Sequence, residues 1–423
     1  MILTRSIRLL FVSVLLLGLS SCDRTHSKKT RWDVPHSGFR SDAPSPAKRG
    51  NAELSNPSFD PTGRWLLALT TFRGLRLWRA SDGQFIKELK GSPVQGWHFT
   101  PHGDAVVVEF ENQPGYHLVS LPSGELLASI AQDGNEQRLA GLTPDGSLAL
   151  VFGSDALEFW SLESGQLEAS IKGPWQPRPY GPMCTVFSGS YFETPCVAFS
   201  PDGAWLAMAY TDPGDTRNPT HYYLVDLRRR EFIPIDIPAI ATEATGGMLF
   251  SPDSRILAMG VSKGLLFFDM ESRSLSPVLA GQHPRNQFLI PAAFSTARIL
   301  VALADQLEVN IVDAAERKIV RRHEPGKKYW EGTFRVSRNG ARVVLYHVRG
   351  DVLEVLDGKT GERVGWVCTY YCNRRNNRFV DFAVSPNGSM VAASHSTGAA
   401  LWGTDADALL APLFDPHLPL LKK

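Results

Sequence analysis

The sequence predicts an all-β fold, a β-propeller of eight four-stranded antiparallel blades. Three observations predict it. A phrase recurs about every forty residues, strand-forming residues alternate with Gly and Pro at regular turn positions, and no helical period is sustained beyond the N-terminus. Each repeat is too small to bury its own apolar face, so neighbouring copies must stack. The repeat therefore overrides the two or three domains otherwise expected of 423 residues.

The repeat is clearest in its first copy. There a turn at 60–63 is followed by apolar runs at 65–69 and 74–78 and by a turn that ends at Gly83. The other copies begin at Phe99, Leu142, Phe199, Phe250, Phe294, Val336 and Val384.

The fourth copy shows how one unit divides into strands. Pieces of strand length lie at 196–199, 205–210, 222–227 and 231–235. In the turn at 200–203, Pro presets φ, Asp bonds its own backbone, and Gly takes a positive φ. Four antiparallel strands per unit, repeated radially, form propeller blades. A seven-bladed ring is the alternative, if the sixth copy, with its turn reduced to 294–297, is not a blade.

The two ends of each blade differ in character. In a meander, the first and third turns lie at one end, and the second turn and the link to the next blade lie at the other. The first and third turns are short, whereas the two longest insertions, 173–194 and 211–220, fall at the opposite end. Because elaborated loops on a rigid scaffold usually carry binding, we expect a partner to bind there.

Residues 1–21 have the features of an export signal. Arg5 and Arg8 precede an apolar stretch at 9–19 that is too short to span a bilayer comfortably. The sequence at 19–22 resembles the lipobox of bacterial lipoproteins, which implies that Cys22 carries acyl chains such as palmitate and becomes the mature N-terminus. An ordinary signal peptide with an incidental cysteine is the alternative.

The remainder divides by composition. Residues 22–50 comprise the lipidated cysteine and a polar segment that we expect to be a flexible tether. The propeller is expected at 51–414, and a short tail at 415–423. Asp23 directly after the cysteine resembles an inner-membrane retention signal.

Cys22 aside, the sequence contains two close pairs of cysteines, Cys184 with Cys196 and Cys368 with Cys372. The pairs precede the fourth and eighth copies, on opposite sides of an eight-fold ring. A disulfide needs Cα atoms within about 7 Å, so we expect local pairing in an oxidising compartment. Free thiols or a metal site are the alternatives.

Residues 51–414 resemble the WD40 and related bacterial propeller repeats. The phrase Phe-Ser-Pro-Asp-Gly at 199–203, followed by an apolar strand, carries the resemblance. The family's Trp is present at Trp78, Trp160 and Trp402, and its Asp survives without the Trp at Asp269, Asp313 and Asp357. The resemblance implies a protein-interaction module that needs no cofactor.

Composition and motifs argue against several other functions. The 44 Lys and Arg residues nearly balance the 43 Asp and Glu residues, so the chain lacks the net positive charge that is typical of nucleic-acid-binding proteins. Motifs of haem attachment, zinc hydrolases and serine hydrolases are absent from the sequence, and we expect no catalytic residue and no metal site. The segment 357–361 with Trp366 resembles the repeat motif of quinoprotein dehydrogenases, but an ordinary turn is the preferred interpretation.

Basic and aromatic residues gather in two neighbouring links at the elaborated end. The candidates for partner binding are Arg321, Arg322, Lys327, Lys328 and Trp330 before the seventh unit, and Tyr370, Tyr371, Arg374, Arg375 and Arg378 before the eighth. Arg and aromatic side chains are common interface anchors. We expect a patch for a protein partner that is acidic or membrane-associated. Anionic headgroups or a solvated rim are the alternatives.

These features predict a membrane-anchored, periplasm-facing bacterial lipoprotein, slightly favoured to lie at the inner membrane. Its propeller would serve as an interaction or assembly scaffold and not as an enzyme. One alternative is a subunit similar to the propeller lipoprotein of the outer-membrane β-barrel assembly machinery. The other is a quinoprotein-like oxidoreductase or another propeller enzyme.

Overall fold

A computed structural model describes residues 55–413, with gaps at 71–73, 90–92, 131–136, 176–196, 212–219, 239–243, 262, 282–288, 305–307, 325–331, 348–351, 369–378, 396–397 and 406–408. The chain divides into two units, 1–43 and 44–423, and all of the described residues belong to the second. Their regular structure is entirely β-strand, and none of the described residues forms a helix long and apolar enough to cross a membrane.

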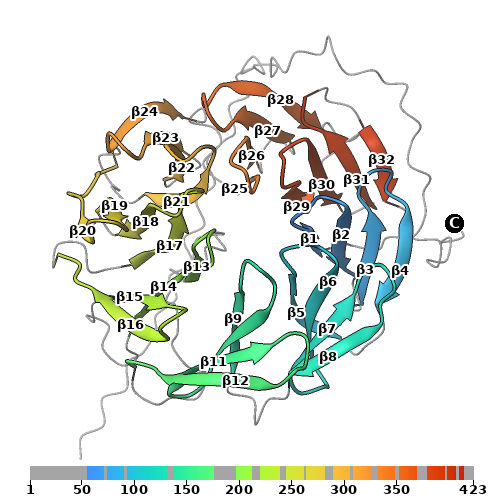
Figure 1. Cartoon of the computed structure of the whole chain (residues 1–423). Helices are drawn as coiled ribbons and strands as arrows, with labels where there is room; N and C mark the ends of the chain where they lie inside the picture. Colours follow the sequence, from blue (N-terminus) through green and yellow to red (C-terminus); the bar gives the residue numbers. More distant parts are fainter. Residues whose placement is uncertain are drawn as a thin grey trace, which may run out of the picture. The chain divides into compact units, whose positions relative to one another are not determined.

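The strands form eight four-stranded antiparallel sheets, each made of four consecutive strands. The sheets follow one another around a ring as blades 1 to 8 (Figure 1). Blades 1 to 4 contain β1 (Ser55–Phe59), β2 (Trp65–Leu69), β3 (Leu75–Arg79), β4 (Phe85–Leu89); β5 (Val94–Phe99), β6 (Ala105–Phe110), β7 (Tyr116–Ser120), β8 (Leu126–Ile130); β9 (Arg138–Leu142), β10 (Leu148–Phe152), β11 (Ala156–Ser161), β12 (Leu167–Lys172); β13 (Val197–Phe199), β14 (Trp205–Thr211), β15 (Thr220–Asp226), β16 (Glu231–Ile235). Blades 5 to 8 contain β17 (Ala244–Phe250), β18 (Ile256–Val261), β19 (Gly264–Asp269), β20 (Ser274–Leu275); β21 (Ile290–Phe294), β22 (Ile299–Leu303), β23 (Val309–Asp313), β24 (Lys318–His323); β25 (Gly332–Val336), β26 (Arg342–His347), β27 (Val352–Asp357), β28 (Arg363–Cys368); β29 (Phe379–Val384), β30 (Met390–His395), β31 (Gly398–Gly403), β32 (Leu409–Leu413).

The predicted eight-bladed propeller is therefore confirmed, and the seven-bladed alternative is wrong. The sixth unit is a complete blade although its first turn lacks Pro, Asp and Gly. Thr296 replaces them, because its Oγ1 accepts hydrogen bonds from the backbone N–H groups of Arg298 at 3.2 Å and Ile299 at 2.9 Å. A side-chain oxygen thus closes the turn without the usual residues.

The first turns follow the predicted chemistry and add a hydroxyl to it. In blade 4, the backbone N–H of Ala204 donates to Asp202 Oδ1 at 3.0 Å, and Gly203 has a φ of 69°. Ser200 Oγ donates to Asp202 Oδ1 at 2.5 Å and accepts from the backbone N–H of Trp205 at 2.9 Å. The serine before the Pro therefore fixes the end of one strand to the start of the next.

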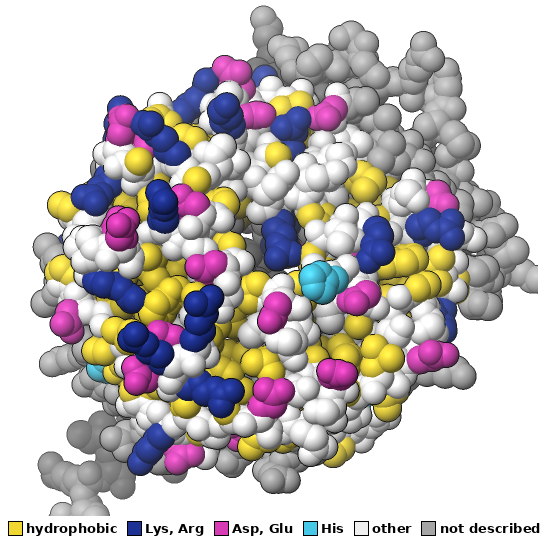
Figure 2. All heavy atoms as spheres, viewed as in Figure 1, with side chains coloured by type: hydrophobic (Ala, Val, Ile, Leu, Met, Phe, Trp, Pro, Cys, Tyr) yellow, Lys and Arg dark blue, Asp and Glu magenta, His cyan; other side chains and the backbone are white. Residues whose placement is uncertain are grey.

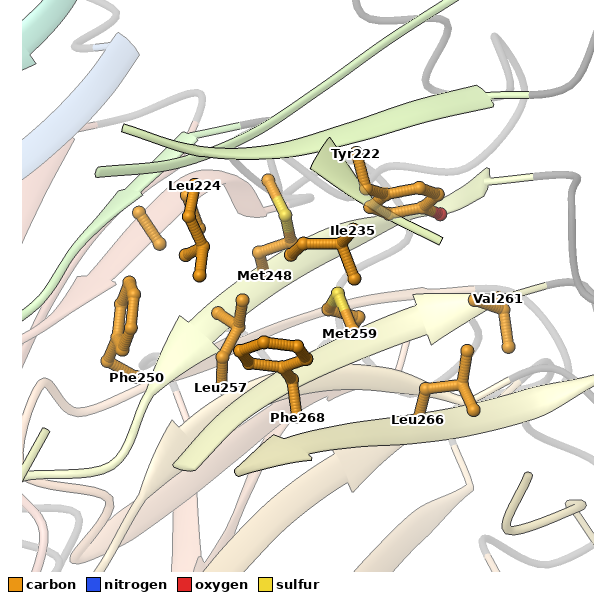
Figure 3. Close-up of a cluster of buried hydrophobic side chains, with 12 residues drawn as sticks. Tyr222, Leu224, Ile235, Met248, Phe250, Leu257, Met259, Val261, Leu266 and Phe268 are labelled. Atoms are coloured by element: carbon orange, nitrogen blue, oxygen red, sulfur yellow. The ribbon is translucent and has the colours of Figure 1, made fainter. Parts of the chain in front are cut away.

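The core lies between the blades. Figure 3 shows the seam of blades 4 and 5, where Tyr222, Leu224 and Ile235 face side chains of the next blade. The side chains on the blade 5 side are Met248, Phe250, Leu257, Met259, Val261, Leu266 and Phe268. Both faces of a blade are buried by its neighbours, which is why the apolar runs of the second and third strands are nearly continuous.

The ring closes between blades 1 and 8 by side-chain packing. Leu66 and Trp78 of blade 1 are fully buried in one cluster with Ala392 and Leu401 of blade 8. Among the described residues, each of these sheets consists of its own four consecutive strands, and no strand is shared across the junction.

Candidate functional site

Most of the residues predicted to bind a partner lie outside the described residues. These are Lys327, Lys328, Trp330, Tyr370, Tyr371, Arg374, Arg375 and Arg378. The predicted lipidation site Cys22 and the cysteines Cys184, Cys196 and Cys372 also lie outside them, whereas Cys368 ends β28. Arg321 and Arg322 are described, and the site is built from them.

Arg321 and Arg322 lie in β24, the outermost strand of blade 6, and not in the link where the sequence analysis placed them. Arg321 pairs with Ile311 and Arg322 with Asn310 of β23, so the two side chains point to opposite faces of the sheet. They therefore contribute to the two different seams that blade 6 forms with its neighbours, and not to one shared patch.

Arg322 belongs to a buried network. Its Nη2 donates to Glu308 Oε2 at 2.5 Å, and Asn310 Nδ2 donates to the other carboxylate oxygen at 2.9 Å. The Glu308 side chain is 5% exposed, and its hydrogen bond raises the pKa of Arg322. A buried carboxylate requires such partners, because an unpaired charge there is costly.

Arg321 reaches across to blade 7. Its Nη1 lies 2.9 Å from Oε1 of Glu362, in the turn between β27 and β28, and both side chains are largely exposed. Exposed ion pairs of this kind contribute little to stability.

A second polar cluster lies in the seam between blades 6 and 7. His347, at the end of β26, is buried, and its Nε2 lies 2.8 Å from Oε2 of Glu354 in β27. His323, at the end of β24, brings its Nε2 to 3.6 Å from the same oxygen. One carboxylate, 4% exposed, therefore faces histidines from two blades.

The environment of Glu354 has opposing effects on its pKa. Burial acts to raise the pKa, but the hydrogen bonds and positive charges of His323 and His347 outweigh burial and lower it to about 2. The carboxylate is therefore ionised at any physiological pH, and it contacts ring nitrogens from both blades.

The cluster reaches the surface through blade 7. Arg363 lies 5.1 Å from the centroid of the Trp366 ring, and its Nη1 is 3.8 Å from Glu354 Oε1. The Trp366 ring in turn lies 5.9 Å from that of His347. Both contacts of Trp366 are within its own blade, and the Arg363 side chain is 55% exposed. A guanidinium stacked on an indole at a partly exposed position is typical of interface anchors.

This seam brings together the strand ends from which the two predicted links depart. The 324–331 link follows His323, and the 369–378 link follows Cys368, which pairs with Val352 at the start of β27. Because His323 and His347 both approach Glu354, these ends are close to one another. The signal in the sequence for this cluster is Glu354, the single charged residue within the apolar run 352–356.

Within the described residues, no set of three or more His, Cys, Asp and Glu side chains is arranged to hold a metal ion. Glu354 Oε2 is already engaged by His347 Nε2. Near the surface, the seam carries Arg363 stacked on Trp366, and it carries Arg321 paired with Glu362 of blade 7.

No protein-family model matches the sequence, and no curated protein matches it. Solved structures do share its fold. A eukaryotic initiation factor matches with a TM-score of 0.53 at 14% identity, over 88% of this chain and 90% of that one. Kuenenia stuttgartiensis hydrazine synthase has a TM-score of 0.47 at 13% identity, over 87% of this chain and 100% of that one. A mitotic checkpoint complex chain has a TM-score of 0.47 at 15% identity, over 72% and 87%. At 14% identity, the likeness to the initiation factor shows the β-propeller fold alone.

Proposed function

We propose that this chain is a membrane-anchored lipoprotein of the bacterial envelope, facing the periplasm, whose propeller is a scaffold for a protein partner. The observation that supports the scaffold role most directly is the seam of blades 6 and 7. There, the buried Glu354 contacts His323 of blade 6 and His347 of blade 7, close to the strand ends from which the basic and aromatic links depart. Binding loops on a rigid scaffold lose less entropy on association than loops on a mobile one.

The anchor is proposed from the N-terminal sequence. The run at 9–22 has the length and the terminal cysteine of a lipoprotein signal, and acyl chains on Cys22 would hold the propeller at a membrane surface. Asp23 favours the inner membrane. The partner is proposed to be acidic, because the links and the seam both present arginine.

Two experiments test the two halves of this proposal separately. Cells that express the chain are labelled with radioactive palmitate and fractionated. Cys22→Ser is expected to abolish labelling and to release the protein from the membrane fraction. Labelling that persists in this variant would refute the anchor and leave the scaffold untouched.

For the partner, proteins are crosslinked in intact cells, captured and identified. Arg374→Glu with Arg375→Glu is expected to abolish capture of the partner found with the unchanged protein. Lys263→Glu is a control for a single charge reversal, because Lys263 is exposed in the second turn of blade 5, at the same end of the ring. Equal capture by the double variant would contradict the proposed site.

A further inference from the structure

The third turns of the blades lie at the end of the ring opposite the links at 324–331 and 369–378. In three successive blades, one position of this turn is an arginine where four other blades have a glycine. In the third turns of blades 1, 2, 3 and 7, the position with a φ of 68–70° is Gly83, Gly124, Gly165 or Gly361. In blades 4, 5 and 6 the same position is Arg230, Arg273 and Arg317, with φ of 58°, 56° and 55°. This conformation is unfavourable for any residue with a Cβ atom, and glycine would relieve it. Three neighbouring blades thus retain a strained residue where a relaxed one would fit. Strain of this kind points to a use for the side chain.

Two of these guanidinium groups are held in place by aromatic rings of the preceding blade. The Cζ of Arg273 lies 4.3 Å from the centroid of the Trp205 ring in blade 4. The Cζ of Arg230 lies 5.5 Å from that of Phe159 in blade 3. Stacking uses the flat face of a guanidinium and leaves its N–H edges free to bind an acceptor. Arg230, Arg273 and Arg317 are all exposed.

The acidic residues of the same turns are directed to the backbone. Asp226 Oδ1 accepts from the backbone N–H groups of residues 228 and 229, Asp269 Oδ1 from those of 271 and 272, and Asp313 Oδ1 from those of 315 and 316. These bonds help to lower the pKa of Asp269 and Asp313, against burial that acts to raise it. The carboxylates that begin the turns therefore stabilise them, and the arginines that end them face solvent.

The surrounding surface decides between classes of anionic partner. On the face seen in Figure 2, Lys and Arg side chains lie over blades 4 to 6, with Asp and Glu side chains between them. Asp253, Glu271 and Glu316 are exposed in first and third turns of blades 5 and 6, at the same end of the ring as the three arginines. A nucleic acid or an anionic membrane presents continuous negative charge and would be repelled by these carboxylates. A polypeptide that carries separate carboxylates can meet the arginines and avoid the acids.

We propose that Arg230, Arg273 and Arg317 form a binding surface for an acidic segment of polypeptide, at the end of the ring opposite the links at 324–331 and 369–378. This surface is independent of the proposed partner site between blades 6 and 7. The propeller would then contact two partners, or two parts of one partner, at the two opposite ends of the ring.

The test uses a variant that cannot fail through misfolding of the turns. Arg230→Gly, Arg273→Gly and Arg317→Gly together remove the side chains and relieve the strain, so the melting temperature is expected to stay equal or rise. The probe is a fluorescent peptide of fifteen glutamates, measured by anisotropy at low salt. The triple variant is expected to bind it about tenfold more weakly than the unchanged protein, since three exposed pairs of modest strength are lost.

A charge-matched control removes the same number of cations from turns at the same end of blades 1 and 7. Arg79→Gln, Arg338→Gln and Lys359→Gln together are expected to leave the affinity for the peptide within about twofold. Equal weakening in both triple variants would overturn the proposal, because it would show that only net charge matters. Peptide binding that does not change in the glycine variant, or is absent from the unchanged protein, would also overturn it. So would equal or tighter binding of an oligothymidylate or of phosphatidylglycerol vesicles.

Discussion

Replacing Glu354 with glutamine removes the charge to which His323 and His347 are both directed and keeps the shape of the side chain. The amide oxygen can still accept a hydrogen bond from His347 Nε2, which lies 2.8 Å from the carboxylate in the unchanged protein. Packing around the site is therefore conserved, and the variant reports on the charge alone. We expect it to be less stable at neutral pH and to lose this disadvantage in acid.

The size of the effect follows from the pKa. Glu354 titrates at about 2 in the folded chain, against an ordinary value of 4.5. At 1.36 kcal/mol per pKa unit, this corresponds to about 3 kcal/mol of stability that the glutamine lacks. Because the folded pKa is lowered, this stability is fully present above the ordinary pKa and is lost as the pH falls towards 2. By linkage, about 1 kcal/mol should be lost at pH 4 and about 2 kcal/mol at pH 3.

Urea unfolding followed by tryptophan fluorescence at a series of pH values measures the difference between the two proteins. The gap in unfolding free energy should narrow steadily below pH 5. A gap of constant size from pH 7 to pH 3 would refute the electrostatic explanation and indicate lost packing. Glu362→Gln is the control, since that carboxylate is 61% exposed in its pair with Arg321. It should change the stability by less than about 1 kcal/mol at any pH.

Three further changes test other parts of the structure by thermal or urea unfolding. Arg322→Gln leaves the buried Glu308 without its cation and should cost about 3 kcal/mol, whereas Arg321→Gln in the next position should cost less than 1. Equal losses would show that burial does not distinguish the two pairs. Gly165→Ala places a Cβ 2.6 Å from the Ser129 carbonyl oxygen at a φ of 69°, so we expect a loss of more than about 1 kcal/mol. A neutral result would mean that the turn relaxes freely. Trp78→Ala empties the core of the junction between blades 1 and 8 and should cost about 3–5 kcal/mol. A smaller loss would indicate that the other seams hold the ring without this one.

The architecture could be predicted because it depends on local signals. Turns such as 200–203 repeat once per blade, and the strands between them are short and apolar, so the number and order of strands follow from the sequence. The first turn of blade 6 was harder to identify, because the Thr296 side chain closes it with hydrogen bonds, whereas Pro, Asp and Gly form the turn in other blades.

The site was less predictable because it depends on packing between blades. The outermost strand β24 is exposed at three of its six positions and half-buried at the other three, and it lacks a clean apolar alternation. Arg321 and Arg322 were therefore predicted to belong to a link. The approach of His323 to Glu354 depends on how β24 of one blade lies against β27 of the next. The sequence pattern does not specify that arrangement, because it predicts where the strands lie in the chain but not which side chains of neighbouring blades meet.

The closure between blades 1 and 8 has a consequence for how such a chain can be rearranged genetically. In the part of the chain that the structure describes, every blade is encoded by one contiguous stretch and the junction shares no strand, so the boundaries of the coding units coincide with those of the blades. A duplication or deletion between two links adds or removes a whole sheet and leaves no partial one. By the same logic, the junction at Trp78 and Leu401 is equivalent to any other seam. Joining the two ends of the ring and opening it at another link should yield a circular permutant with the same eight blades.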